Sequence, residues 1–260
     1  MRRKRRQYYK AEARRLLDRQ NLYVLIMAAL LLVMMSIAWQ VIVSGFFSFF
    51  HFETGSLTPE NEQIVMAAET TVNLLGVLIL LMPLWYGFCA IARTMVFAQE
   101  DATPAEPGQL FCAFSSPRIL LRVWRASLWI FWRFAFSAGL IWGMWYGVGL
   151  LEPHLPGLAY FALCTAAVVL TPLLLFPLAG THLIFPLLLD NPTLGIFSAV
   201  WRSMRLSWRA LGETLLFWMS FLPWFALGFA TGGVMLVLYV LPYFILADTL
   251  YAGFLLARGR

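Results

Sequence analysis

The sequence predicts an all-α, polytopic transmembrane bundle of about six helices, arranged as three hairpins with both termini in the cytoplasm. Three observations predict it. Hydrophobic residues make up 61% of the 260 residues and charged residues only 12%, whereas soluble domains average about 25% charged residues. Apolar stretches long enough to span a bilayer recur along the chain, and the basic residues gather beside alternate connections. We therefore expect a membrane protein.

Six segments reach the roughly 20 mostly apolar residues that a spanning helix needs. Residues 1–21 are expected to form a polybasic cytoplasmic segment, and 22–260 a single transmembrane domain. Within 221–256 only the Ala-Thr-Gly-Gly stretch at 230–233 offers a turn, so this region holds two spans if the turn forms and one if it does not. The expected helices lie at about 22–44, 66–92, 127–150, 158–187, 213–231 and 234–256.

The helix expected at 158–187 is the least regular of the six. It is longer than the hydrocarbon layer requires, and it contains Pro172, Pro177 and Pro186. Proline removes a backbone donor and kinks a helix, so we expect a kink, a tilt or an amphipathic extension on the inner side.

The basic residues predict the orientation. With the N-terminus inside, the outer connections at about 45–65, 151–157 and 230–233 contain no Lys or Arg, and every basic residue except Arg133 falls on the inner side. Short loops follow the positive-inside rule, which favours this topology.

Two basic segments precede apolar helices, and each contains a Trp-Arg-Ala step. The first basic segment, 118–126, and the second, 202–210, are offset by 84 residues. Each places three arginines on one helical face, so each could form a separate amphipathic helix in the headgroup layer. Alternatively, the arginines only anchor the adjoining spans. The arginines expected to contact anionic lipid here are Arg118, Arg122, Arg125, Arg202, Arg205 and Arg209.

The repeated segments suggest three related hairpins. A fainter third copy is the Ala-Glu-Ala-Arg-Arg stretch starting at Ala11, ahead of the first span. The returning helices carry Pro83, Pro177 and Pro242 in comparable places. Such a pattern is typical of parallel internal repeats, although interfacial helix starts commonly use Arg, Trp and Ala in any case.

The N-terminus carries the densest block of positive charge. Each basic residue near an anionic leaflet contributes about 1 kcal/mol of attraction, so membrane lipids of the inner leaflet are the expected partners. A nucleic-acid partner is not expected, because no reader domain accompanies the basic arm. The lipid-contacting residues expected in this block are Arg2, Arg3, Lys4, Arg5 and Arg6.

Few ionisable side chains fall within the expected spans. Arg133 and Asp248 lie at similar depths on the cytoplasmic side and could pair; alternatively, Arg133 snorkels to the headgroups while Asp248 is neutral or hydrated. Glu69 and Asn73 share a helical face, where they could contact a polar ligand or form the commoner interhelical hydrogen bonds.

No catalytic motif, cofactor motif or metal-ligand spacing occurs, so we predict neither enzymatic activity nor a cofactor nor a metal. Two functions remain. The first is a non-enzymatic auxiliary or scaffold protein that engages anionic lipid and other membrane proteins, or further copies of itself. The alternative is a small-molecule or lipid carrier, or a permease component, indicated by the proline-broken helices and the embedded polar residues.

The C-terminal quarter, from Asp190 to Phe254, resembles the bacterial integral-membrane proteins of the domain-of-unknown-function 975 family. In that family a Ser-rich basic segment leads into a helix, a Gly-containing turn and a last helix with Pro-Tyr and Tyr-Ala-x-Phe steps. The resemblance implies a multi-pass protein of the bacterial cytoplasmic membrane and supplies no activity. The matching residues are Ser198, Ser203, Gly228, Gly232, Pro242, Tyr243, Tyr251, Ala252 and Phe254.

Overall fold

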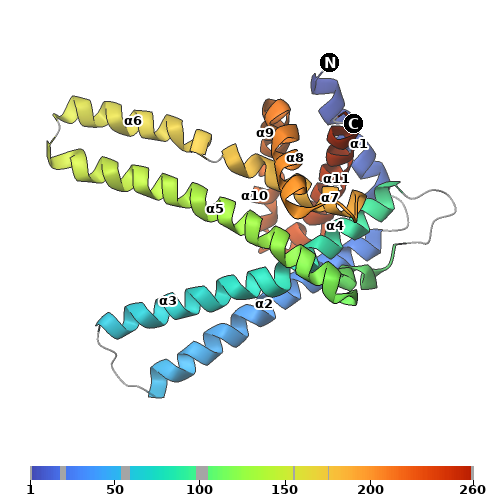
Figure 1. Ribbon diagram of the computed structural model, residues 1–260, viewed down its shortest axis with the longest axis horizontal. Helices are drawn as coiled ribbons and strands as arrows, with labels where there is room; N and C mark the ends of the chain where they lie inside the picture. Colours follow the sequence, from blue (N-terminus) through green and yellow to red (C-terminus); the bar gives the residue numbers. More distant parts are fainter. Residues whose placement is uncertain are drawn as a thin grey trace. The chain divides into compact units, whose positions relative to one another are not determined.

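The computed structural model describes residues 2–17, 22–53, 59–97, 105–154, 156–174 and 176–258, and all of its regular elements there are helical (Figure 1). The α-helical elements are α1 (Arg2–Leu17), α2 (Leu22–Glu53), α3 (Pro59–Gly76), α4 (Met82–Phe97), α5 (Pro117–Leu151), α6 (Gly157–Leu174), α7 (Ile184–Asp190), α8 (Ile196–Arg209), α9 (Leu211–Met219), α10 (Leu222–Ala230) and α11 (Leu241–Arg258). Short 3₁₀ or π segments are η1 (Val77–Leu81), η2 (Pro107–Ser115), η3 (Glu152–His154), η4 (Phe176–Leu183) and η5 (Leu236–Val240).

Five helices in the described part of the chain are long and apolar enough to cross a membrane by length and composition. They are Leu22–Phe49, Glu62–Phe97, Pro117–His154, Leu211–Ala230 and Leu236–Arg258. The all-helical class is therefore confirmed within the described residues, and the five long apolar helices suggest a membrane protein. The number of six, the three hairpins and the N-in, C-in topology stay predictions.

The single helix expected at 158–187 is wrong. Its apolar part, Gly157–Thr171, is shorter than the other five, and the stretch continues as η4 and then α7. Pro177 and Pro186 lie in the first turns of η4 and α7. Proline is tolerated in a first turn, where its missing N–H is not needed, but not in a helix interior, so the segment divides there.

The turn expected at 230–233 is confirmed. Gly232 and Gly233 both have positive φ, +65° and +88°, a conformation that side-chain-bearing residues rarely adopt. Gly228 precedes the turn and Leu236 follows it, and a Cβ built on Gly228 would lie 3.1 Å from Leu236 Cβ. The two helices thus approach closely across the turn, and 221–256 is not one continuous helix.

Two π-turns interrupt helices just before prolines. η1 ends two residues before Pro83, and η5 ends two residues before Pro242. Pro83 has no N–H to donate to the Ile79 carbonyl four residues earlier. The Trp124 Nε1 donates to that oxygen instead, at 3.1 Å. Wider turns and side-chain donors are ordinary ways to accommodate proline within a long helix.

The chain packs as two units, residues 1–124 with 217–258 and residues 125–216. The division expected from the sequence, a basic segment at 1–21 and one transmembrane domain at 22–260, stays a prediction. Unit 1 has a densely packed core formed by α1, α4, η2 and α11. Phe88, Tyr243 and Tyr251 are almost completely buried in it. A Cβ on Gly87 would clash with the Leu110 carbonyl oxygen, so only glycine allows η2 to pack this close to α4.

The N-terminal helix α1 packs against α11 within unit 1. Tyr9 contacts the Tyr251 ring, with centroids 5.9 Å apart. Lys10 Nζ donates to the Ser220 carbonyl at 3.0 Å and lies 4.4 Å from the Phe221 ring centroid. Through Tyr9 and Lys10, α1 is therefore held against other helices of unit 1. The side chains of Arg2, Arg3, Lys4, Arg5 and Arg6 lie outside the described side chains, so their lipid contacts stay a prediction.

In unit 2, α8 packs on η4. A Cβ on Gly180 would lie 3.2 Å from Met204 Cα, which shows how closely the two backbones approach. The C-terminal half of α5 is far less covered by other residues of the protein. In the apolar helix Pro117–His154, only 11% of the most apolar window is buried. A membrane helix with such a surface must face lipid or another protein.

Candidate functional site

The second basic segment forms a helix of its own, α8. The chain reaches it through a turn in which Thr193 N and Oγ1 both donate to Asn191 Oδ1, at 3.1 and 2.7 Å. α8 ends at Arg209, and α9 begins at Leu211 after a turn at Ala210. The second basic segment is thus a helix separate from the span that follows it. A position of this helix in the headgroup layer stays a prediction.

One face of α8 is buried against the protein. Its buried residues recur every three or four positions, as an amphipathic helix requires, and they are small or aliphatic: Ala199, Val200, Ser203, Leu206 and Ser207. This face packs on η4 and α7. What the helix presents outward is a mixture of arginine and tryptophan.

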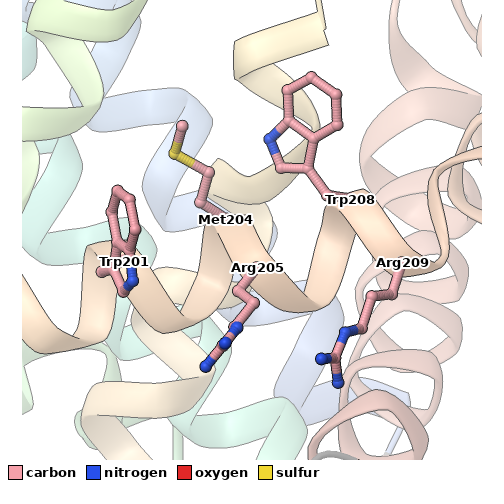
Figure 2. Close-up of a pocket in the computed structure, with 5 residues that line it drawn as sticks. All are labelled: Trp201, Met204, Arg205, Trp208 and Arg209. Carbon is pink, nitrogen blue, oxygen red and sulfur yellow. The ribbon is translucent and has the colours of Figure 1, made fainter.

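The outward face of α8 forms an open groove of about 430 Å³. Figure 2 shows Arg205 and Arg209 projecting from one side of the helix, and Met204 and Trp208 from the other. The residues lining this α8 groove are Trp201, Met204, Arg205, Trp208 and Arg209. Arg202 is half-buried and does not line the groove. Of the three arginines of this segment that were predicted to contact lipid, Arg205 and Arg209 therefore line it.

Arg133 of α5 lies against the Met204 wall of the groove. It is 8% exposed, its Nη2 lies 2.7 Å from Met204 Sδ, and its Nη1 has no hydrogen-bond partner among the described residues. One turn earlier on α5, Trp129 contacts Phe197 of α8, with ring centroids 6.1 Å apart. Arg133 is thus buried, and its snorkelling to the headgroups stays a prediction. Asp248 belongs to unit 1, so pairing between the two residues stays a prediction.

The first basic segment is built differently. Arg118, Arg122 and Arg125 all lie in α5, which continues without a break into its apolar span. Arg118 and Arg125 are exposed, and Arg122 is half-buried. This continuity matches the second interpretation, in which arginines anchor the end of a span.

Glu69 and Asn73 both lie on α3 and are half-buried. Ser44 Oγ of α2 lies 3.5 Å from Glu69 Oε1, at the outer limit of a hydrogen bond. The Asn73 Oδ1 is buried with no hydrogen-bond partner among the described residues. The contact with Ser44 agrees with the interhelical use of these residues, and a polar ligand on their face stays a prediction.

The sequence patterns single out Trp208, in its Trp-Arg-Ala step, but not Trp201 or Met204, and all three are candidate functional residues of the groove. Trp201, Met204 and Trp208 are spaced i, i+3, i+7, which places them on one helical face beside the arginines. That spacing is visible in the sequence. It does not stand out there because the apolar residues of the buried face have the same periodicity.

The groove combines two cations with exposed aromatic surface, which suits an amphipathic anion at a membrane surface. Within the described ranges, no cluster of three His, Cys, Asp or Glu side chains could hold a metal ion. No protein-family model, curated protein or solved structure matches the chain. The resemblance to the 975 family therefore stays a prediction.

Proposed function

We propose that this protein is a non-enzymatic auxiliary or scaffold protein of a bacterial cytoplasmic membrane, related to the 975 family, with both termini in the cytoplasm. It engages anionic lipid through its basic inner face and other membrane proteins through its exposed helices. The α8 groove is the observation that carries the lipid part. Arg205 and Arg209 are exposed there beside two exposed tryptophans, Trp201 at 61% and Trp208 at 54%.

The α5 helix supports the protein-contact part. Its glycines at Gly139, Gly143 and Gly147 recur at i, i+4 and i+8, and a Cβ built on any of them meets nothing within 4 Å. Small residues at this spacing let transmembrane helices approach closely. The stretch also carries exposed aromatic residues, including Trp142 at 68% exposed.

A carrier or permease component is the second candidate. It is favoured by the two π-turns before prolines and by the divided stretch from α6 to α7, because interrupted helices line binding sites in many transporters. A carrier would bind a defined small molecule, and a scaffold would bind lipid and protein in fixed proportion.

Native mass spectrometry of the gently solubilised protein tests these alternatives. We expect retained anionic lipid and a stoichiometric second protein or second copy. Gly143→Leu should lose the protein component, while Gly45→Leu on α2, whose Cβ position is also open, should keep it. A bound metabolite in place of lipid and protein would contradict the scaffold function and support the carrier.

A further inference from the structure

We propose that the α8 groove is a site for one anionic glycerophospholipid. The phosphate lies between Arg205 and Arg209, and the glycerol and upper acyl chains lie along Trp201, Met204 and Trp208. The inference rests on the proposed function, because it assigns a ligand class and a stoichiometry to the same site. It differs from general attraction between a basic surface and an anionic leaflet, which would need no defined site.

The basic side of the groove has the spacing that a single phosphate requires. Arg205 and Arg209 are i, i+4 neighbours, whose Cβ atoms lie about 5–6 Å apart on a helix. Both side chains project from the same side of α8 (Figure 2). Guanidinium groups bind phosphate oxygens through paired N–H donors, so two of them can share one phosphate.

The apolar side of the groove identifies the phosphate as part of an amphipathic molecule. Trp201, Met204 and Trp208 line the groove beside the arginines. Inorganic phosphate would use only the two guanidinium groups and would leave this surface exposed to water. A glycerophospholipid places hydrocarbon against it, and tryptophan is enriched at this level of the bilayer.

The position of the groove along the chain places it at headgroup level. Arg209 lies two residues before Leu211, where the apolar helix Leu211–Ala230 begins. Arg205 is one turn earlier on α8, about 6 Å along the axis of that helix at 1.5 Å per residue. A group so close in the chain to the start of an apolar helix is expected in the headgroup layer, which adds about 5–7 Å to each side of the hydrocarbon core.

Arg133 provides an independent indication of an anion. Its guanidinium is more than nine-tenths buried, reaches the Met204 sulfur in the groove wall, and has an unpartnered Nη1 among the described residues. A thioether is only a weak acceptor. Buried charges in proteins are normally paired, because an unpaired one loses its hydration without compensation. Negative charge bound between Arg205 and Arg209 faces this third guanidinium only across α8, because Met204 and the two arginines project from opposite sides of the helix (Figure 2).

Lipid titration of the full-length protein, monitored by native mass spectrometry in a mild detergent, tests the site. The probes are phosphatidylglycerol, phosphatidylcholine and about 10 mM inorganic phosphate as competitor. We expect one phosphatidylglycerol to bind at least about tenfold more tightly than the following ones, a difference of about 1.4 kcal/mol. Neither phosphatidylcholine nor inorganic phosphate should displace it.

The double variant R205Q/R209Q should lower this first affinity about tenfold or more. The matched control R118Q/R125Q removes the same charge from exposed arginines of the first basic segment, and it should change the affinity less than about twofold. W201L/W208L should weaken phosphatidylglycerol binding while both charges remain. All six residues are exposed, so the variants should fold, which an unchanged melting temperature would verify.

If R205Q/R209Q and R118Q/R125Q lowered the phosphatidylglycerol affinity equally, only total charge would matter and the defined site would be overturned. The attraction of anionic lipid to the basic face, which belongs to the proposed function, would still stand. Displacement by inorganic phosphate would also overturn the lipid assignment and identify a free-phosphate site. If wild-type protein bound phosphatidylglycerol and phosphatidylcholine equally, both the site and the lipid part of the proposed function would be wrong.

Discussion

The two basic segments share the Trp-Arg-Ala step at an offset of 84 residues, but the matched tryptophans have different environments. Trp124 is half-buried, and its indole donates to the Ile79 carbonyl. Trp208 is 54% exposed and lines the α8 groove. The same short sequence thus contributes to the packing of unit 1 in one place and to an open surface of unit 2 in the other.

The difference arises from how the chain continues after each segment. The first continues as α5 into its span, so its orientation is set by the long helix. The second ends at a turn before α9 and is held by its buried face on η4. In the second segment the Trp-Arg-Ala step thus turns both Trp208 and Arg209 outward, whereas in the first Arg125 is exposed and Trp124 is half-buried. Sequence similarity between the segments therefore does not imply equal function.

The largest effect that would test this comparison is expected at Trp124. Trp124→Leu removes the donor to a carbonyl that Pro83 cannot serve, and it also removes a half-buried ring. We expect a loss of about 2–3 kcal/mol in the free energy of unfolding. Trp208→Leu should change it by less than about 0.5 kcal/mol, because its ring is largely exposed. Thermal unfolding in detergent, followed by tryptophan fluorescence, measures both.

Trp124→Phe helps to separate the two contributions, since it removes the donor but keeps one aromatic ring in place of the larger indole. If Trp208→Leu destabilised the protein as much as Trp124→Leu, the second basic segment would also have a structural role. The comparison between the segments would then fail.

Much of the fold could be predicted because apolar length and Gly-Gly turns are local signals. The turn at Gly232 and Gly233, the helical class and most of the apolar helices follow from them. The hydrogen bond from Trp124 to Ile79 joins residues 45 positions apart, and no local pattern encodes it. Likewise, the division of 158–187 is predicted only as a kink, because prolines indicate where a helix weakens but not how the chain continues.

The candidate site was predicted in part. Arg205 and Arg209 were expected to face lipid, and they line the α8 groove. Which apolar face of α8 is buried could not be decided, because two sets of residues repeat with helical spacing. The small set around Ser203 fits closely against Gly180 of η4, and this fit leaves the bulky tryptophans outside. Periodicity identifies faces, whereas shape complementarity selects between them.

Helix α1 carries the N-terminal copy of the basic segment, and a substitution just before that copy is expected to have a smaller effect on stability. Lys10→Met removes the donor to Ser220 and the cation over the Phe221 ring while keeping most of the apolar stem. We expect a loss of about 1–2 kcal/mol in unfolding free energy. Arg15→Met removes the same charge from an exposed position of the same helix and should be nearly neutral. Equal effects would show that α1 is retained by charge alone.

The smallest effect concerns the fit of α8 on η4. A Cβ on Gly180 would lie 3.2–3.3 Å from backbone atoms of Ser203 and Met204. Backbone cannot move aside as a flexible side chain can, so Gly180→Ala should cost about 1 kcal/mol and shift α8. Gly143→Ala, on the continuous helix beyond the first basic segment, meets nothing within 4 Å and should be neutral or slightly stabilising.

The lipid affinity of the same two variants distinguishes a local shift from general damage. Gly180→Ala should lower phosphatidylglycerol binding in the native mass spectrometry titration, because Met204 both lines the α8 groove and contacts Arg133. Gly143→Ala should leave the binding unchanged. A destabilised Gly180→Ala protein with unchanged lipid affinity would show that the groove does not depend on its support by η4. In that case the outward face would be a property of α8 alone.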